Sequence, residues 1–434
     1  MELYEKKYLS VGALLKTIRS KFSLISETKK HINGFSLVDC LMSGLAMFSL
    51  KMPSLLQFNN SRNDDVIKHN LKTLYGVASA PSDTYMREKL DIVDPNGLRS
   101  AYTSIFSNLQ RGKILEDYVF MDGYYLIALD GSEYFSSKNI HCQNCCETHH
   151  TNGKITYHHQ LFSGVIIHPD YKEVFPLCPE PIIKQDGDTK NDCETNACNR
   201  FLADLKREHP HLRVAVTTDS LHSTGPRIRQ LMADGMRFIM GVKPGSHKSL
   251  FDWIENLKLL ELEVVKDGVS YKFRWINGIP LNDSHSDLSV NFLECVITEP
   301  KTNEKRFTWV TNFYINESNV FKLSQGGRAK WKIENETFNT LKNQGYNIEH
   351  NYGHGYKYLN IVFMMLMMLA FFVDQVQQRA CTLFQAALKK TKTRTALWEK
   401  QRALFTEYFI LDWLDMFHAI ATGHGRAHLP QRPP

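Results

Sequence analysis

The sequence lacks the segments that mark secreted and membrane-spanning proteins. Its first residues contain no apolar core followed by a small-residue cleavage site, so we expect no signal peptide. Its most apolar run, 361–373, is shorter than the roughly 20 residues that span a bilayer, and we expect it to form a buried helix. Internal repeats and low-complexity tracts are also missing. These features predict a globular, cytoplasmic protein with no membrane partner.

A strong charge of either sign is also missing. The 434 residues include 52 Lys and Arg and 46 Asp and Glu, which gives a net charge of +6. The distribution is uneven, because residues 1–75 and 376–434 each carry +5 and residues 76–375 carry −4. Basic ends around an acidic middle suit a protein that binds a polyanion and keeps carboxylates at its centre. Two solvated basic faces would give the same balance.

Cysteine occurs nine times, an odd number that argues against a disulfide framework and favours reduced thiols. Cys142 and Cys145 form a Cys-x-x-Cys pair, and such a pair closes a tetrahedral zinc site when two further ligands join it. Because a second Cys-x-x-Cys is absent, a loop of reduced thiols is the alternative. The candidates for the further ligands are four histidines that follow closely, His149, His150, His158 and His159.

Residues 1–112 carry apolar side chains at helical spacing and are expected to form a helical DNA-binding region. Within this region, a helix over 66–75, a stop at Gly76 and a new helix capped by Ser82 or Asp83 outline a helix-turn-helix. Two ordinary packed helices would give the same pattern.

From residue 115 the pattern changes to short apolar strands alternating with amphipathic helices. The expected order is three strands, a helix, a strand, a helix and a strand, which is typical of a mixed α/β sheet. A β-rich insertion follows over 246–325, then a helix over 330–342 and a helical tail from residue 360. The predicted strands cover 124–129, 160–167, 173–177, 212–218 and 237–242, and the predicted helices cover 191–208, with Asn191 as cap, and 226–233.

Three acidic residues are the candidates for chemistry in this pattern. Asp130 and Asp219 each end a predicted strand, and Glu334 lies on the predicted helix over 330–342. Strand ends are where α/β folds usually place reactive and metal-binding groups. The alternatives are ordinary turn chemistry for the two aspartates and exposed helix surface for the glutamate.

The residues around these acids resemble the DDE catalytic domain of bacterial insertion-sequence transposases in the IS-four superfamily. The resemblance covers most of the chain. Its most specific part is Arg328–Lys342, in which basic residues and Trp331 precede Glu334 while a Phe and a Lys follow it. The other matching segments are Ile127–Gly131, Val214–Asp219, Gln344–Tyr346, His350–Gly355, Asp39–Cys40 and Lys51–Leu56.

The resemblance implies a fold with defined divisions. We expect an RNase H-like mixed sheet of the α/β class with a β-rich insertion, flanked by helical N-terminal and C-terminal regions. The implied divisions are 1–112 for DNA binding, 115–245 for the first part of the catalytic core, 246–325 for the insertion, 326–358 for the Glu helix that completes the core and 359–434 for the C-terminal helices.

The resemblance also implies an activity. Asp130, Asp219 and Glu334 would bind two divalent metal ions, magnesium or manganese, which serve the attacking and leaving oxygens of a phosphodiester. The protein would bind double-stranded DNA at the transposon ends, cleave it and join it to target DNA, acting as a homodimer. An RNase H-like nuclease without strand transfer and an inactive DNA-binding relative are the alternatives.

Two positions depart from the family pattern. Its commoner form has a Tyr seven residues before the Glu and a Lys seven residues after it, where this chain has Gly327 and Leu341. Lys342 lies one step further along, and if its spacing were decisive, Glu336 would take the place of Glu334. The Trp-x-Ile-Glu match favours Glu334.

Several side chains near the acids are expected to contact DNA. Arg328, Lys330 and Lys342 would contact phosphates, with a solvated basic helix face as the alternative. The insertion contributes Trp275 and Trp309, which would either stack on a flipped base or belong to the core.

Overall fold

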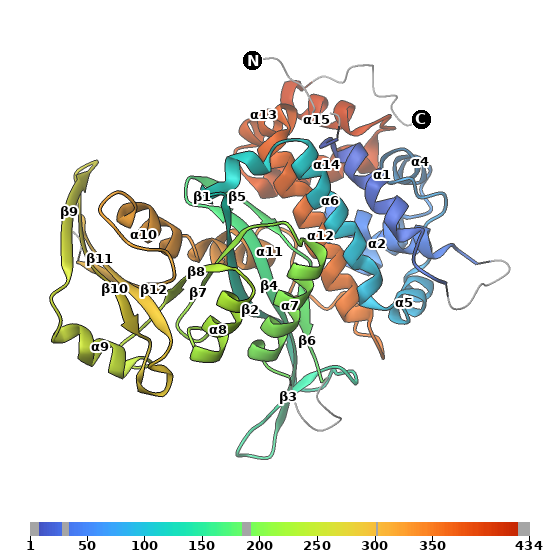
Figure 1. Ribbon diagram of the computed structural model, residues 1–434. Coiled ribbons are helices and arrows are strands. Elements are labelled where there is room, and N and C mark those ends of the chain that lie inside the picture. Colours follow the sequence, from blue (N-terminus) through green and yellow to red (C-terminus); the bar gives the residue numbers. More distant parts are fainter. Residues whose placement is uncertain (1–7, 28–33, 185–191, 301–302, 424–434) are drawn as a thin grey trace.

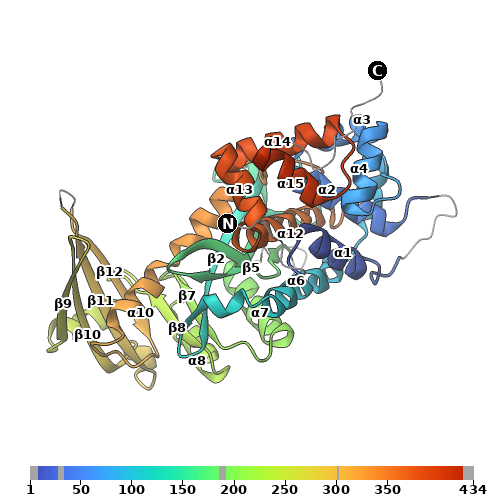
Figure 2. The same ribbon diagram turned by 90° about the horizontal axis from the view of Figure 1, so that it is seen from above.

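The computed structural model describes residues 8–27, 34–184, 192–300 and 303–423. A mixed sheet of twelve strands runs through this part of the chain. Helices from both ends of the chain gather beside one end of the sheet, and the strands of the insertion lie at the opposite end (Figure 1, Figure 2). The predicted α/β class with helical flanks is confirmed.

The central strands follow the predicted order. Antiparallel strands come first, and β7 and β8 are then added in parallel to β2, through the crossover helices that parallel pairing requires. The elements are β1 (Val119–Met121), β2 (Tyr124–Ser137), β3 (Cys146–His149), β4 (Ile155–His168), β5 (Tyr171–Pro176), β6 (Glu180–Ile182), α7 (Glu194–Glu208), β7 (Val214–Thr218), α8 (Gly225–Ala233) and β8 (Arg237–Gly241).

Two local expectations in this region are wrong. Asp130 does not end its strand, because β4 continues to supply partners and places Ser163 opposite Asp130, so β2 runs on to Ser137. The predicted cap Asn191 lies outside the described residues, and α7 begins at Glu194, after Cys193, which makes no side-chain capping bond.

The insertion continues the central sheet. Strand β12 pairs antiparallel with β8, with Thr311 opposite Ile239, so the predicted β-rich segment shares one hydrogen-bonded sheet with the core. Trp275 and Trp309 are 2% and 4% exposed and belong to the apolar core. The elements are α9 (Lys248–Glu255), β9 (Leu260–Lys266), β10 (Val269–Pro280), η3 (Asp283–His285), β11 (Ser289–Thr298) and β12 (Lys305–Thr311).

The segment that carries Glu334 is not the single α-helix that was predicted. It comprises α10 (Val320–Arg328), a π-helix labelled η4 (Ile333–Phe338) and α11 (Asn339–Asn343). Trp331 lies between α10 and η4 and is 46% exposed, although helical spacing placed it toward the core.

The helices of the two chain ends pack into one layer. Asn70 on α4 donates to the carbonyl oxygens of Phe405 and Tyr408 at 2.8 and 2.7 Å. Ser82 caps α5, as predicted, by accepting from the Tyr85 amide. The elements are α1 (Val11–Phe22), α2 (Leu37–Ser49), α3 (Leu55–Ser61), α4 (Asp65–Tyr75), α5 (Asp83–Asp91), η1 (Pro95–Leu98), α6 (Arg99–Arg111), η2 (Leu115–Tyr118), α12 (Leu359–Ala380), α13 (Thr382–Thr391), α14 (Arg394–Glu407) and α15 (Trp413–Thr422).

Helix α12 is the centre of this layer. It contains 22 residues, its most apolar window of 18 residues has a mean hydropathy of 2.0, and among the described residues it alone is long and apolar enough to cross a membrane. Of its most apolar stretch, 89% is buried inside the protein. It is therefore a core helix, longer than the apolar run had indicated.

Candidate functional site

Two of the predicted acids lie at neighbouring positions of the sheet. Strands β2 and β7 pair in parallel with Ala128 opposite Thr217. Asp130 lies two residues after Ala128, and Asp219 lies two residues after Thr217. This register therefore places both aspartates at the same end of the paired segment. The negative charge of Asp219 disfavours ionisation of Asp130.

The third acid joins them through a lysine. Lys330 donates from Nζ to Oδ2 of Asp130 at 2.9 Å and also to the Glu334 carboxylate. Lys330 itself is largely buried, whereas the Glu334 side chain is 54% exposed. The fold thus brings Asp130 and Glu334 to one ammonium group, although they come from distant parts of the chain, and the charge of Asp219 acts on Asp130 from the neighbouring strand.

Burial and charge shift the ionisation of this group. Burial raises the pKa of Asp130 above its ordinary value, Lys330 opposes that rise, and the carboxylates of Glu334 and Asp219 add to it. Burial alone would lower the pKa of Lys330, but Asp130 and Glu334 bring it above the usual value. Ionisation of Asp130 therefore depends on positive charge nearby, which the ammonium of Lys330 supplies in this conformation.

The acids are not arranged as ligands of one ion in this conformation. In the described part of the chain, the one group of three or more His, Cys, Asp or Glu ligand atoms close enough to share an ion is the Cys/His cluster defined below. Lys330 occupies the space between Asp130 and Glu334 instead. Binding of a metal between these two carboxylates requires the ammonium to move away.

The π-helix separates the two candidate glutamates. Glu334 faces Lys330, whereas Glu336 is buried and its Oε2 lies 3.9 Å from the guanidinium of Arg394. Lys332 fixes the helix on the sheet, because its Nζ donates to carbonyl oxygens in the turn between β4 and β5. Glu334 therefore lies beside Asp130, and Glu336 points toward the C-terminal helices.

A fourth carboxylate lies beside Asp130. A Cβ atom added to Gly131 would lie 2.4 Å from Oε1 of Glu194, so this side chain covers the backbone next to Asp130. Oε2 of Glu194 lies 3.7 Å from Nε2 of the buried His222. Sequence analysis gave Glu194 no part in the site. Its signal was the glycine after Asp130, which leaves room for a neighbouring side chain.

The predicted phosphate contacts have protein partners in this conformation. Lys330 binds the acids, and Lys342 forms an ion pair with Glu349 at 2.9 Å. The Arg328 guanidinium lies 5.4 Å from the centre of the Phe307 ring, a cation–π distance. Contact with DNA would require these groups to exchange partners.

Packing explains both departures from the family pattern. A Cβ on Gly327 would lie 2.4 Å from Nε1 of Trp309, so the indole fills the space that a tyrosine would need. Leu341 is fully buried, and a lysine there would lose its hydration without gaining a partner. The chain therefore replaces two polar positions of the family pattern with core packing.

The second cluster consists of Cys142, Cys145, His159 and His354, and we call it the Cys/His cluster. Its four ligand atoms all lie within 4.8 Å of one another. The two sulfurs are 3.9 Å apart, and Nε2 of His159 lies 3.4 Å from each of them. Nε2 of His354 lies 3.2 Å from the Cys145 sulfur. This geometry can hold a metal ion.

The predicted ligand set is only partly present in this cluster. Both cysteines and His159 belong to it, but the exposed His149 and His150 contact Glu147 and Thr156 instead. The fourth member, His354, was missed as a ligand. Its signal was the segment His350–Gly355, which the family resemblance had singled out without assigning it a metal.

Sulfur chemistry in the cluster favours a bound cation. A hydrogen bond from the Cys145 thiol, together with His159 and His354, lowers the pKa of Cys142 far below that of a free thiol. All nine cysteines of the chain are free, as expected for reduced thiols. A thiol with a lowered pKa ionises more readily, and the thiolate is the form that binds metals.

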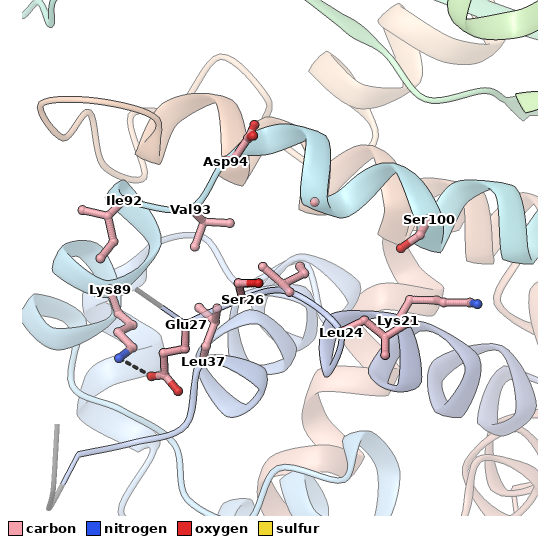
Figure 3. Close-up of a pocket in the computed structure, with 12 residues that line it drawn as sticks. Lys21, Leu24, Ser26, Glu27, Leu37, Lys89, Ile92, Val93, Asp94 and Ser100 are labelled. Atoms are coloured by element: carbon pink, nitrogen blue, oxygen red, sulfur yellow. Dashed lines mark ion pairs between the residues drawn. The ribbon is translucent and has the colours of Figure 1, made fainter. Parts of the chain in front are cut away.

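A pocket of about 490 Å³ lies elsewhere, beside α1, α2 and α5 (Figure 3). An ion pair between Lys89 and Glu27 lies along its wall. Leu24, Ile92 and Val93 make much of the remaining surface apolar. The pocket contains none of the acids and no member of the Cys/His cluster.

Comparison with known proteins finds no family model that matches the chain and no match among curated proteins. The functional assignment therefore depends on the two clusters and on the motifs around them.

Proposed function

We propose that this protein is a DDE transposase of the IS-four superfamily, which binds the ends of its insertion sequence, cleaves DNA and joins the cut ends to target DNA. Two observations carry this proposal: Lys330 joins Asp130 to Glu334, and the register of β2 and β7 places Asp219 beside Asp130. Antiparallel strands followed by two parallel strands support an RNase H-like core. Cut-and-paste transposition is the reaction that this core and these motifs suit best.

Within this proposal the chain has defined tasks. Asp130, Asp219 and Glu334 would hold two divalent ions, magnesium or manganese, which supply activation of the attacking oxygen and stabilisation of the leaving oxygen. Lys330 keeps two of the carboxylates close together before ions bind. Once released, its ammonium is free to pair with a DNA phosphate, which agrees with the phosphate contact predicted for it.

The two clusters would take different ions. Carboxylate oxygens suit magnesium, whereas thiolate sulfur and imidazole nitrogen suit zinc. We therefore propose zinc for the Cys/His cluster and magnesium or manganese for the acids.

The proposed partners follow from the reaction. Double-stranded DNA, as transposon ends and as target, would contact the basic regions at the two chain ends, each of which carries +5. Joining two ends in one complex requires two copies of the chain, so we propose a homodimer on DNA in the cytoplasm.

Incubation of the purified protein with magnesium and linear DNA that carries the element's own ends tests the proposal. We expect cleavage at the ends and joining of the freed ends to a second DNA. Asp130→Asn, Asp219→Asn and Glu334→Gln should each lower the rate by about 1000-fold, because each removes charge from the metal-binding group. Binding of the ends without cleavage by the unaltered protein would overturn the proposal.

Glu336→Gln is the matched control for Glu334→Gln. It makes the same chemical change two residues away, on a side chain that faces Arg394 instead of Lys330. We expect it to keep cleavage activity. Loss of cleavage in Glu336→Gln together with retention in Glu334→Gln would reverse the assignment of the third acid. Cleavage without joining would favour the nuclease.

A further inference from the structure

We propose that Cys142, Cys145, His159 and His354 form a closed zinc site that fastens the segment after the Glu-bearing helices to the central sheet. The proposal concerns folding of the chain and does not depend on the transposase reaction. It extends the predicted Cys-x-x-Cys pair to a complete set of four ligands and assigns the ion a structural task.

The distances match a tetrahedral zinc ion. With zinc–sulfur and zinc–nitrogen bonds of about 2.3 and 2.05 Å, a tetrahedron places two sulfurs about 3.8 Å apart and a sulfur and a nitrogen about 3.6 Å apart. The two sulfurs are separated by 3.9 Å, and the sulfur–nitrogen contacts are 3.4, 3.4 and 3.2 Å. These four distances lie within about 0.4 Å of the values for zinc, and the remaining pairs of ligand atoms lie within 4.8 Å of one another.

Burial indicates a structural ion. Cys145 and His159 are 1% and 0% exposed, and His354 is 9% exposed. Four protein ligands complete the coordination of zinc and leave no position for water or substrate. The rings of Tyr134 and Phe135 pack against the two imidazoles. The ring centroids of Tyr134 and His159 are 5.9 Å apart, and those of Phe135 and His354 are 4.6 Å apart.

The ligands come from three separate parts of the chain. The two cysteines lie between β2 and β3, His159 lies on β4, and His354 lies between α11 and α12. The sequence separation of Cys145 and His354 is 209 residues. An ion bound by all four therefore closes a long loop, and it joins the strands that follow Asp130 to the segment that follows Glu334.

Other hydrogen bonds hold the segment around His354 in place next to the two cysteines. The Asp91 carboxylate, at the end of α5, accepts from the backbone amides of Lys357 and Leu359 at 2.9 and 3.0 Å. Asn144, between the two cysteines, donates to the carbonyl oxygen of Lys357. Lys332 anchors the start of the Glu-bearing π-helix to the sheet. Zinc bound by His354 would anchor the chain beyond the end of that helix in the same way.

Metal analysis and cobalt substitution test the proposal. We expect one zinc per chain in full-length protein purified without chelator. Replacement by Co²⁺ should give the intense visible bands of a tetrahedral site with sulfur and nitrogen ligands. His354→Ala and Cys145→Ser should weaken zinc binding by at least about 100-fold, since even loss of an outer-shell partner weakens it by about 10- to 100-fold.

Matched controls separate the cluster from its neighbours. Cys146→Ser alters the next cysteine, whose sulfur faces the Ile182 carbonyl oxygen at 3.7 Å, and His150→Ala alters an exposed histidine. Both variants should retain zinc. If Cys145→Ser fails to fold, cobalt titration of the unaltered chain still decides the outcome. Folded protein that takes up neither zinc nor cobalt overturns the proposal, and so does His354→Ala with unchanged zinc affinity.

Discussion

The acid group and the Cys/His cluster each bring together side chains from distant parts of the chain, but they differ in exposure and in the groups that surround their ligand atoms. The acids lie at an accessible edge, where Glu334 is 54% exposed and Lys330 balances their charge. The Cys/His cluster is buried, and its four ligand atoms face one another directly. Under the two proposals, the exposed group with a movable counter-ion serves a substrate, and the buried, closed group serves the fold.

Selective removal of metals is the strongest way to break this comparison. Withdrawal of magnesium and manganese should lower DNA cleavage by about 1000-fold, because the acids then lack their ions, and should leave the fold unchanged. Removal of zinc by a strong chelator should speed amide hydrogen exchange by about tenfold or more in 142–146 and 353–358. Cleavage assays and exchange mass spectrometry measure the two effects.

Recovery of cleavage should also differ between the two treatments. Readdition of magnesium should restore cleavage at once, whereas recovery after zinc removal should follow the return of exchange protection. If zinc removal left exchange in both segments unchanged, the distinction between a site for substrate and a site for the fold would fail.

The exposed indole beside the acids offers a second test. Stacking was predicted for Trp275 and Trp309, which are buried, whereas Trp331 is exposed; if Trp331 stacks on a base instead, Trp331→Ala should weaken binding of DNA ends by about 5- to 100-fold, because stacking contributes about 1–3 kcal/mol. Its 46% exposure means that little folding free energy should be lost. Trp309→Ala is the contrasting variant and should lower the free energy of unfolding by about 3–5 kcal/mol, because that indole is core. Unchanged DNA affinity in Trp331→Ala would exclude the stacking role.

The pH dependence of cleavage tests how Lys330 affects ionisation of Asp130, and its expected effect is the smallest of those described. Metal binding needs ionised Asp130, whose raised pKa places the acid limb of the rate above the ordinary aspartate value of 3.8. Lys330 lowers that pKa, so Lys330→Met should move the limb to higher pH and leave the alkaline plateau much less affected. Lys342→Met, whose ammonium pairs with Glu349, should not move it. A downward movement in Lys330→Met would contradict this electrostatic account.

Much of the fold could be predicted because strand and helix patterns are local. The alternation of strands and helices between residues 115 and 245 follows from side-chain periodicity, and so does the cap at Ser82. The length of β2 could not be predicted, because Asp130-Gly131 resembles a turn until β4 supplies partners. Pairing of β12 with β8 depends on contacts between segments far apart in sequence, and local patterns do not record these.

The candidate sites were predictable to different degrees. Asp130 and Asp219 follow the apolar stretches of two strands whose parallel pairing places them together, so strand periodicity led to both, although β2 continues beyond Asp130. His354 could not be connected with Cys145 from spacing, because 209 residues separate them. Trp331 was placed in the core because helical spacing assumes an α-helix, whereas the chain enters a π-helix just beyond it.

That π-helix makes the region sensitive to chain length. A π-helix hydrogen-bonds to the fifth residue along rather than the fourth, so it accommodates an extra residue within a turn. Deletion of one residue between 333 and 338 would relax the segment to an α-helix and rotate one flank against the other by about 100°. Lys332 would then lose its three carbonyl partners, or Glu336 would move away from Arg394. Homologous chains should therefore tolerate substitutions in this segment far more readily than a change in its number of residues.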